Sequence, residues 1–279
     1  MVTMPAGVVV PLDGSKTAEA AVPVAAAIAK TYGLPVQFVH VLAGEDGTDA
    51  ARANDVLRDY VARLTKNAGI PEGTYSGAIV EGQPARAILD FAKDAKFIVI
   101  SSHGRGGFRA AVIGSVADKV VRGSDVPVFL VPATAEVGDM TAGPVLVGLD
   151  GSPVAEQGLA AARDLAGRLN LKIVLLRSYS MPPAIGMEFG TYPADLLPAL
   201  KETAEAYLNE VAKAGEEKYT ALDSPALALQ EGAEKLNAGV IVLTSHGKGI
   251  AGRLALGSTT DRIMHSLKRV MLIVPVATD

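Results

Sequence analysis

Two short glycine-rich segments contain the residues of this sequence that are best suited to bind an anion. The first reads Ser-Ser-His-Gly-Arg-Gly-Gly-Phe over residues 101–108 and closes on a Gly-Ser pair at 114–115. The second reads Thr-Ser-His-Gly-Lys-Gly over residues 244–249 and closes on Gly-Ser at 257–258. Each follows a β-branched apolar run and precedes a helix-like pattern. A glycine loop that enters a helix presents backbone N–H groups and the positive end of the helix dipole, so both segments predict phosphate binding.

The two segments belong to an internal repeat. Gly247 follows Gly104 by 143 residues, and the Asp-Gly-Ser triplets that begin at Asp13 and Asp150 are 137 residues apart. Matched landmarks in one order across two halves indicate a duplication with small insertions in the second copy.

The domain organisation follows from this repeat and from the length of the chain. A chain of 279 residues is long enough for about two domains. We predict one domain at residues 1–134 and a second at 144–279. Residues 135–143, which are small, acidic and without periodicity, form the predicted linker.

Composition excludes several classes of function. The absence of cysteine excludes disulfides, thiolate metal sites and cysteine nucleophiles, and the four histidines lack the spacing of a zinc helix. A net charge of −4 without any run of Lys or Arg argues against a nucleic-acid or anionic-membrane surface. No apolar run reaches the roughly 18 residues of a membrane helix and no basic leader is present, so the expected location is the cytoplasm.

Strand-like runs alternate with helical patterns through both halves. This order predicts right-handed βαβ crossovers and an α/β fold of two tandem open sheets, each with five parallel strands and helices on both faces. The last strand of each half would be an apolar edge that needs covering, so we expect the two last strands to pair, with pseudo-twofold symmetry. The predicted strands are 7–10, 35–41, 75–80, 97–100 and 126–131, then 145–149, 172–176, 219–222, 240–243 and 270–274.

Several helix boundaries are also readable. Ser15 is a predicted N-cap and Gly33 a predicted stop, while Pro23 should kink or shorten the helix between them. Pro153 suits the first position of the corresponding helix in the second half. A longer connection at 179–198 is either a lid over the sheet or a packed surface insertion.

In open parallel sheets, ligands bind beyond the carboxyl ends of the strands. Asp13 and the loop that ends at Gly104 should meet there if their strands are neighbours, and Asp150 and Gly247 should do the same. A carboxylate can accept hydrogen bonds from ribose hydroxyls while loop N–H groups hold phosphates. An Asp-Gly-Ser triplet alone is more typical of a turn and helix cap, but its recurrence beside the glycine loop favours a site.

Other residues near the loops have simpler interpretations. Ser115 and Ser258 are preferred N-cap residue types, a role that is compatible with a phosphate contact. His103 and His246 are interpreted as structural, because no arrangement suited to nucleophilic catalysis accompanies them. Arg105 and its counterpart Lys248 are interpreted as solvated loop cations.

Two common nucleotide motifs are absent. The order GxxxxGK[ST] of a P-loop is not found around Gly14-Ser15-Lys16-Thr17. A Rossmann fingerprint would place GxGxxG directly after the first strand, where this chain has Asp-Gly-Ser.

An Asp-Gly-Ser turn after the first strand, combined with a glycine, nine residues and Gly-Ser, resembles the universal stress protein family. The resemblance covers nearly the whole chain as a tandem pair and implies a fold like that of the adenine nucleotide alpha hydrolases. It also implies adenine-nucleotide sites. In the first copy the candidate nucleotide-binding residues are Pro11, Leu12, Asp13, Val41, Ser101, His103, Gly104, Arg105, Gly114, Ser115, Val116 and Ala117. In the second copy they are Gly148, Leu149, Asp150, Ser178, Thr244, His246, Gly247, Gly257, Ser258, Thr259 and Thr260.

The chain departs from the family pattern at one place in both copies. The first glycine of the pattern is Ser101 in one copy and Thr244 in the other, and these side chains either crowd the ribose or point away from it. Val41 in the first copy corresponds to Ser178 in the second, so the two pockets are expected to bind unequally.

The resemblance implies an ATP-binding regulatory module of the stress response, with Mg²⁺ entering through the nucleotide phosphates. No catalytic residue is predicted, because a general base, a nucleophile and a dedicated magnesium carboxylate are not evident. A weak ATPase or another ATP-using enzyme of this fold, and an interaction scaffold that binds no nucleotide, remain alternatives. The expected partners are an adenine nucleotide and the chain itself, through the last strands and as a homodimer.

Overall fold

The computed structural model describes residues 6–42, 50–104, 113–134, 140–182, 192–245, 256–266 and 268–276. The first half contains β1 (Val8–Pro11), α1 (Lys16–Glu19), α2 (Ala21–Tyr32), β2 (Val36–Leu42), α3 (Ala50–Ala68), β3 (Tyr75–Glu81), α4 (Pro84–Phe91), β4 (Phe97–Ser101), α5 (Ser115–Gly123) and β5 (Val128–Val131). The second half contains β6 (Val145–Gly148), α7 (Pro153–Leu169), β7 (Ile173–Tyr179), α8 (Leu196–Val211), β8 (Glu217–Leu222), α9 (Pro225–Lys235), β9 (Val240–Thr244), α10 (Ser258–His265) and β10 (Val270–Val274). Within these ranges no helix combines the length and apolarity of a membrane span.

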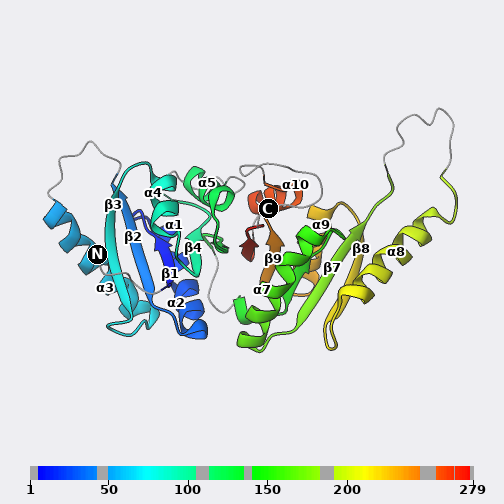
Figure 1. The fold of residues 1–279 in the computed structure, drawn as a ribbon, viewed down its shortest axis with the longest axis horizontal. Helices are drawn as coiled ribbons and strands as arrows, with labels where there is room; N and C mark the ends of the chain where they lie inside the picture. Colours follow the sequence, from blue (N-terminus) through cyan, green and yellow to red (C-terminus); the bar gives the residue numbers. More distant parts are fainter. Residues whose placement is uncertain are drawn as a thin grey trace.

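The ten strands form one sheet in the order β3-β2-β1-β4-β5-β10-β9-β6-β7-β8 (Figure 1). Strands within each half pair in parallel, as βαβ crossovers require, which confirms the predicted α/β class. The expected pairing of the last strands is also present. β5 and β10 run antiparallel, with Phe129 opposite Leu272, and join the halves about a pseudo-twofold axis. Since each of these strands has a neighbour on both sides, a homodimer would have to use another surface.

Alternating residues of the strands fill two cores, one on each face of the sheet. Val8 and Val10 belong to the core on the face covered by α2, α3, α7 and α8, while Val9 belongs to the core on the face covered by α4, α5, α9 and α10. Burial on both faces explains why the strands read as nearly continuous apolar runs. The alternation also fixes on which face each polar residue at a strand end must lie.

Local signals in the sequence set several helix ends. Ser15 caps α1 by accepting a hydrogen bond from the Ala18 N–H at 3.2 Å, as predicted. The helix is interrupted at Ala20 and resumes as α2, so Pro23 lies in the first turn of a new helix, where its missing N–H is tolerated. Gly33 ends α2 in the left-handed conformation with φ of 65°.

The halves also contact each other through helices. On one face, the Arg168 guanidinium of α7 stacks over the Tyr32 ring of α2 at 4.5 Å. Tyr32 in turn packs edge-on against Phe97, and Phe97 against Phe129, with centroid separations of 4.8 and 5.4 Å. Burial, together with the neighbouring Asp164 carboxylate, raises the pKa of Tyr32, which therefore stays neutral.

The described end of the predicted linker is packed. Met140 is fully buried and belongs to the core on the face of the sheet covered by α2 and α7. A Cβ atom on Gly143 would lie 1.8 Å from the backbone oxygen of Asn237, so only glycine fits there. Residues 135–139 lie outside the described ranges, as do residues 183–191 of the connection that was predicted as a lid or an insertion.

An ion pair in the second half predicts how stability depends on pH. Arg163 donates to both carboxylate oxygens of Glu216, at 2.7 and 2.9 Å, and the Glu216 side chain is only 7% exposed. The hydrogen bond from Arg163 lowers the pKa of Glu216 and outweighs the opposing effect of burial. A lowered folded-state pKa stabilises the protein fully above the unfolded-state value of about 4.3, and this contribution is lost as the pH falls through the folded-state value.

We therefore expect Glu216→Gln to reduce the free energy of unfolding by about 1–3 kcal/mol at neutral pH and to flatten its decline between about pH 5 and 3. Urea unfolding at a series of pH values measures both effects. Glu217→Gln is the matched control, because Glu217 is half-exposed and solvent screens its pair with the exposed Lys172, so the loss of stability should be clearly smaller. Equal losses in the two variants would contradict the prediction.

Candidate functional site

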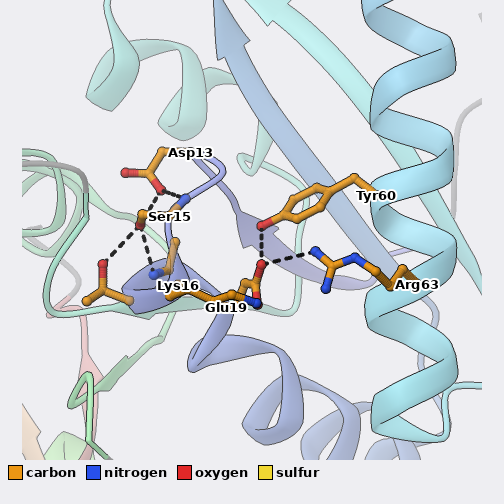
Figure 2. Close-up of polar contacts among 8 residues, drawn as sticks. Asp13, Ser15, Lys16, Glu19, Tyr60 and Arg63 are labelled. Atoms are coloured by element: carbon orange, nitrogen blue, oxygen red, sulfur yellow. Dashed lines mark hydrogen bonds and ion pairs between the residues drawn. The ribbon is translucent and has the colours of Figure 1, made fainter.

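The end of β1 turns sharply on Asp13. Its Oδ1 accepts hydrogen bonds from the Ser15 N–H at 2.9 Å and from the Ser15 hydroxyl at 2.6 Å (Figure 2). Gly14 takes a φ of 84°, which a residue with a side chain rarely adopts. The triplet is thus a turn and helix cap, as its sequence indicates.

The second half has a turn with the same hydrogen bonds to the aspartate and to the serine cap. Asp150 Oδ1 accepts from the Ser152 N–H at 2.9 Å and from the Ser152 hydroxyl at 2.5 Å, and Ser152 caps α7 through the Ala155 N–H. Gly151 has a φ of 77°. Because β6 lies between β7 and β9, the turn is at the carboxyl edge of the sheet between two parallel neighbours.

The glycine loop approaches the turn closely in the first half. A Cβ atom on Gly104 would lie 2.5 Å from Asp13 Oδ2, so the second carboxylate oxygen faces the Gly104 backbone and only glycine permits that approach. The Thr17 hydroxyl donates to the Gly104 carbonyl at 3.2 Å and fixes the loop against α1. The expected meeting of the β1 and β4 ends is therefore present.

The helices after the glycine loops are capped by glycine. Gly114 and Gly257 are the N-caps of α5 and α10, so the expectation that Ser115 and Ser258 cap these helices is wrong; each serine is the first helical residue. The N–H of Gly114 donates to the Ser102 carbonyl at 2.7 Å, and that of Gly257 to the Ser245 carbonyl at 2.9 Å. A glycine cap has no side chain that could accept a hydrogen bond from the first N–H groups, so no cap side chain competes with a ligand for them.

The two residues that replace the first glycine of the family pattern lie on one face of the sheet. Strand alternation directs Ser101 and Thr244 toward the face covered by α2 and α7. The Thr244 methyl group lies 3.4 Å from where a Cβ atom of Gly158 in α7 would be. In the first half, the position that corresponds to Gly158 is Ala21 of α2. The second half therefore has the larger strand residue, threonine instead of serine, and the smaller helix residue, glycine instead of alanine. The Thr244 methyl therefore packs against α7, although Thr244 also borders the hollow described next.

A hollow with a cavity volume of about 120 Å³, partly open to solvent, lies at the carboxyl edge of the second half. The ends of β6, β7 and β9 and the starts of α9 and α10 surround it. The candidate residues that the structure brings together here are Gly148, Leu149, Asp150, Ser178, Thr244, Gly257, Ser258, Thr259 and Thr260. His246 and Gly247 lie outside the described residues, as do Arg105 of the first half and Lys248.

The hollow has an apolar wall that sequence reasoning did not find. Its additional lining residues are Ala155, Leu176, Pro225, Leu229 and Leu243. The only signal in the sequence was the helix start at Pro225, with Leu229 one turn later on the same side. The lining of the hollow thus combines apolar side chains with a carboxylate and a helix start, a combination typical of small-molecule sites.

In the first half the candidate residues occupy corresponding positions. The Leu12 N–H donates to the Val39 carbonyl at 2.9 Å, and the Leu12 carbonyl lies 2.7 Å from His40 Nδ1. Pro11 ends β1, Val41 lies near the end of β2, and Val116 and Ala117 follow Ser115 in the first turn of α5. His103 Nδ1 lies 2.9 Å from the Ser102 hydroxyl, within its own loop.

A tyrosine–glutamate pair beside each turn was also missed. The Tyr60 hydroxyl donates to Glu19 at 3.2 Å, and Arg63 approaches the same oxygen at 3.3 Å (Figure 2). Burial raises the pKa of Glu19, but hydrogen bonds from Lys16, Arg63 and Tyr60 outweigh it, so the net shift is downward. In the second half, Tyr207 donates to Glu156 at 3.1 Å and the Arg177 guanidinium stacks over the Tyr207 ring at 4.4 Å. Each pair fixes the helix after the turn against the next helix, α3 or α8.

Comparison with known proteins finds one family in both halves. The model of the Universal stress protein family matches residues 6–132 and 142–275. Universal stress protein Rv2005c of Mycobacterium tuberculosis is 29% identical, with 96% of each chain covered, and Universal stress protein Rv2623 is 28% identical, with 96% of this chain and 95% of that one covered. A universal stress protein from Archaeoglobus fulgidus shares the fold, with a TM-score of 0.69 at 19% identity over 96% of this chain and 98% of that chain. The chain belongs to the universal stress protein family.

Proposed function

We propose that this protein is a regulatory module that binds an adenine nucleotide, with ATP as the expected form, in the hollow of the second half. The observation that carries the proposal is the convergence of three different surfaces on one hollow. These are the apolar wall with Leu229 and Leu243, the Asp150 carboxylate, and the start of α10. A nucleotide has three parts that match these surfaces, namely a flat base, a ribose diol and an anionic phosphate.

Each part of the nucleotide has a matching surface. The leucine side chains would contact the base, because they exclude water and offer no competing polar group. Asp150 would accept hydrogen bonds from the ribose hydroxyls, since its carboxylate lines the hollow. The first-turn N–H groups of Ser258, Thr259 and Thr260 would hold phosphate, aided by the helix dipole. Mg²⁺ would enter through the phosphates, and the choice of adenine as base rests on the family resemblance.

The two halves are not expected to bind equally. Asp13, Gly104, Gly114 and Ser115 recur in the first half, but Val41 replaces Ser178. In the first turn of α5, Val116 and Ala117 occupy the positions that Thr259 and Thr260 occupy in α10. Both threonines border the hollow, and Thr260 also donates to the Thr244 carbonyl at 3.0 Å. The second half therefore offers more hydroxyl groups to a phosphorylated ligand.

Mass spectrometry of ligand released from freshly purified full-length protein, followed by calorimetry with ATP, ADP, AMP, adenosine and GTP, tests the proposal. We expect an adenine nucleotide in the released fraction and saturable binding of ATP that exceeds that of GTP. Absence of bound nucleotide together with absence of heat from all adenine ligands would refute it. The effect on self-association and the cytoplasmic location remain predictions; sedimentation with and without ATP measures the first.

A further inference from the structure

One arginine connects the two helices whose first turns would hold phosphate. Arg122 lies in the last turn of α5, and its Nε donates to Asp118 Oδ1 at 2.9 Å. Its Nη2 donates to Asp261 Oδ1 of α10, a residue of the other half of the chain. The two helices lie next to each other near the centre of the molecule (Figure 1). Arg122 thus makes an ion pair with one carboxylate from each half.

Both carboxylates lie close to the proposed phosphate positions. Asp261 is three residues after Ser258, and Asp118 is three residues after Ser115, so each is about 4.5 Å along the helix axis from the first helical residue. A negative charge there opposes a phosphate bound at the same helix start. The three side chains are about one-quarter to one-third exposed, so solvent screens this repulsion only in part.

The arrangement is not symmetric. The repeat spacing of 143 residues places His265 where the first half has Arg122. His265 Nε2 lies 4.0 Å from Asp261 Oδ1 on its own helix. In the described part of the chain, the ion pair between the two helices therefore joins an arginine of the first half to a carboxylate near the start of α10 in the second half.

We propose that Arg122 sets the affinity of the second-half pocket for phosphate-bearing ligands by neutralising Asp261 across the boundary between the halves. Arg122 acts as a positioning residue, through a carboxylate, and need not touch the ligand. The inference rests on the proposed nucleotide site and adds that this site depends on a residue of the other half. It also identifies Asp261 as a group that disfavours anions when it is not paired.

An interdomain tether that only stabilises the fold would have a different signature. Loss of a tether changes the free energy of unfolding and lowers the affinity for every ligand to a similar extent. If charge neutralisation is lost, the decrease in affinity grows with the charge of the ligand and becomes smaller as the ionic strength rises. Comparing ligands that differ only in phosphate number therefore separates the two roles.

The test is calorimetry of full-length Arg122→Met with adenosine, AMP, ADP and ATP at low salt. We expect adenosine affinity to stay within about twofold of the original, AMP to weaken about threefold, and ATP to weaken by about tenfold or more. Raising the salt concentration should shrink the differences. Arg122→Met/Asp261→Asn should recover the ATP affinity of the second-half pocket to within about twofold, because the unpaired carboxylate near the start of α10 is then removed.

Arg58→Gln is the matched control: it removes one positive charge from an exposed position of α3 and should leave all four affinities unchanged. Equal weakening for adenosine and ATP, or no recovery in the double variant, would overturn the inference while leaving nucleotide binding intact. If the unaltered protein binds none of the four ligands, the proposed function fails and this inference fails with it. Circular dichroism and urea unfolding verify that each variant is folded.

Discussion

Asp150→Asn is expected to weaken ATP binding in the second-half pocket by about 10–100-fold. Asparagine keeps an oxygen in the place of Oδ1, so the hydrogen bonds from the Ser152 N–H and hydroxyl can persist and the turn stays formed. The charged acceptor for the ribose hydroxyls is lost. Hydrogen bonds to charged groups contribute about 1.5–3 kcal/mol each, which corresponds to the expected change in affinity.

Calorimetry of Asp13→Asn, Asp150→Asn and the double variant resolves which half binds. Asp150→Asn should have the larger effect on ATP, because the second half has the additional hydroxyls of Ser178 and Thr259. Ser152→Ala is the structural control, since it removes the cap of α7 but keeps the carboxylate. Loss of binding in Ser152→Ala with normal binding in Asp150→Asn would contradict the role given to Asp150.

Phe129→Ala should be among the most destabilising substitutions in this chain, at about 3–5 kcal/mol. Phe129 is fully buried in β5 at the joint between the halves. It lies opposite Leu272 of β10 and packs edge-on against Phe97 at 5.4 Å. Removing the ring leaves a cavity in the core on one face of the sheet, next to Phe97, which cannot collapse without shifting the sheet or the helices that cover it.

Equilibrium urea unfolding measures this loss. Val56→Ala is the control, because Val56 is 64% exposed on α3 and should change stability by less than about 0.5 kcal/mol. Phe129→Leu should fall between the two, since it restores most of the apolar contact. A loss below about 1 kcal/mol for Phe129→Ala would mean that the β5–β10 joint contributes little to folding.

Local features of the fold were predictable because neighbouring residues determine them. The Ser15 cap, the left-handed Gly33 and the Asp13 turn each depend on hydrogen bonds or dihedral angles within a few residues. The strands were predictable because a sheet covered on both faces requires continuous apolar runs. The caps of α5 and α10 were predicted one residue late, because serine is a common cap while the backbone geometry here places glycine in that position.

The sequence by itself determined the duplication, the order of strands and helices along the chain, the family and the two turns that begin at Asp13 and Asp150. Only the tertiary structure decided that Leu229 and Leu243 form the apolar wall of the hollow, and that the side chain of Thr244 packs against α7. It also decided that Arg122 reaches Asp261, 139 residues further along the chain. Periodicity and spacing specify which face of its own element a residue occupies. The partner across that face depends on strand order and on the pseudo-twofold pairing of β5 with β10, which bring together residues with no relation in sequence.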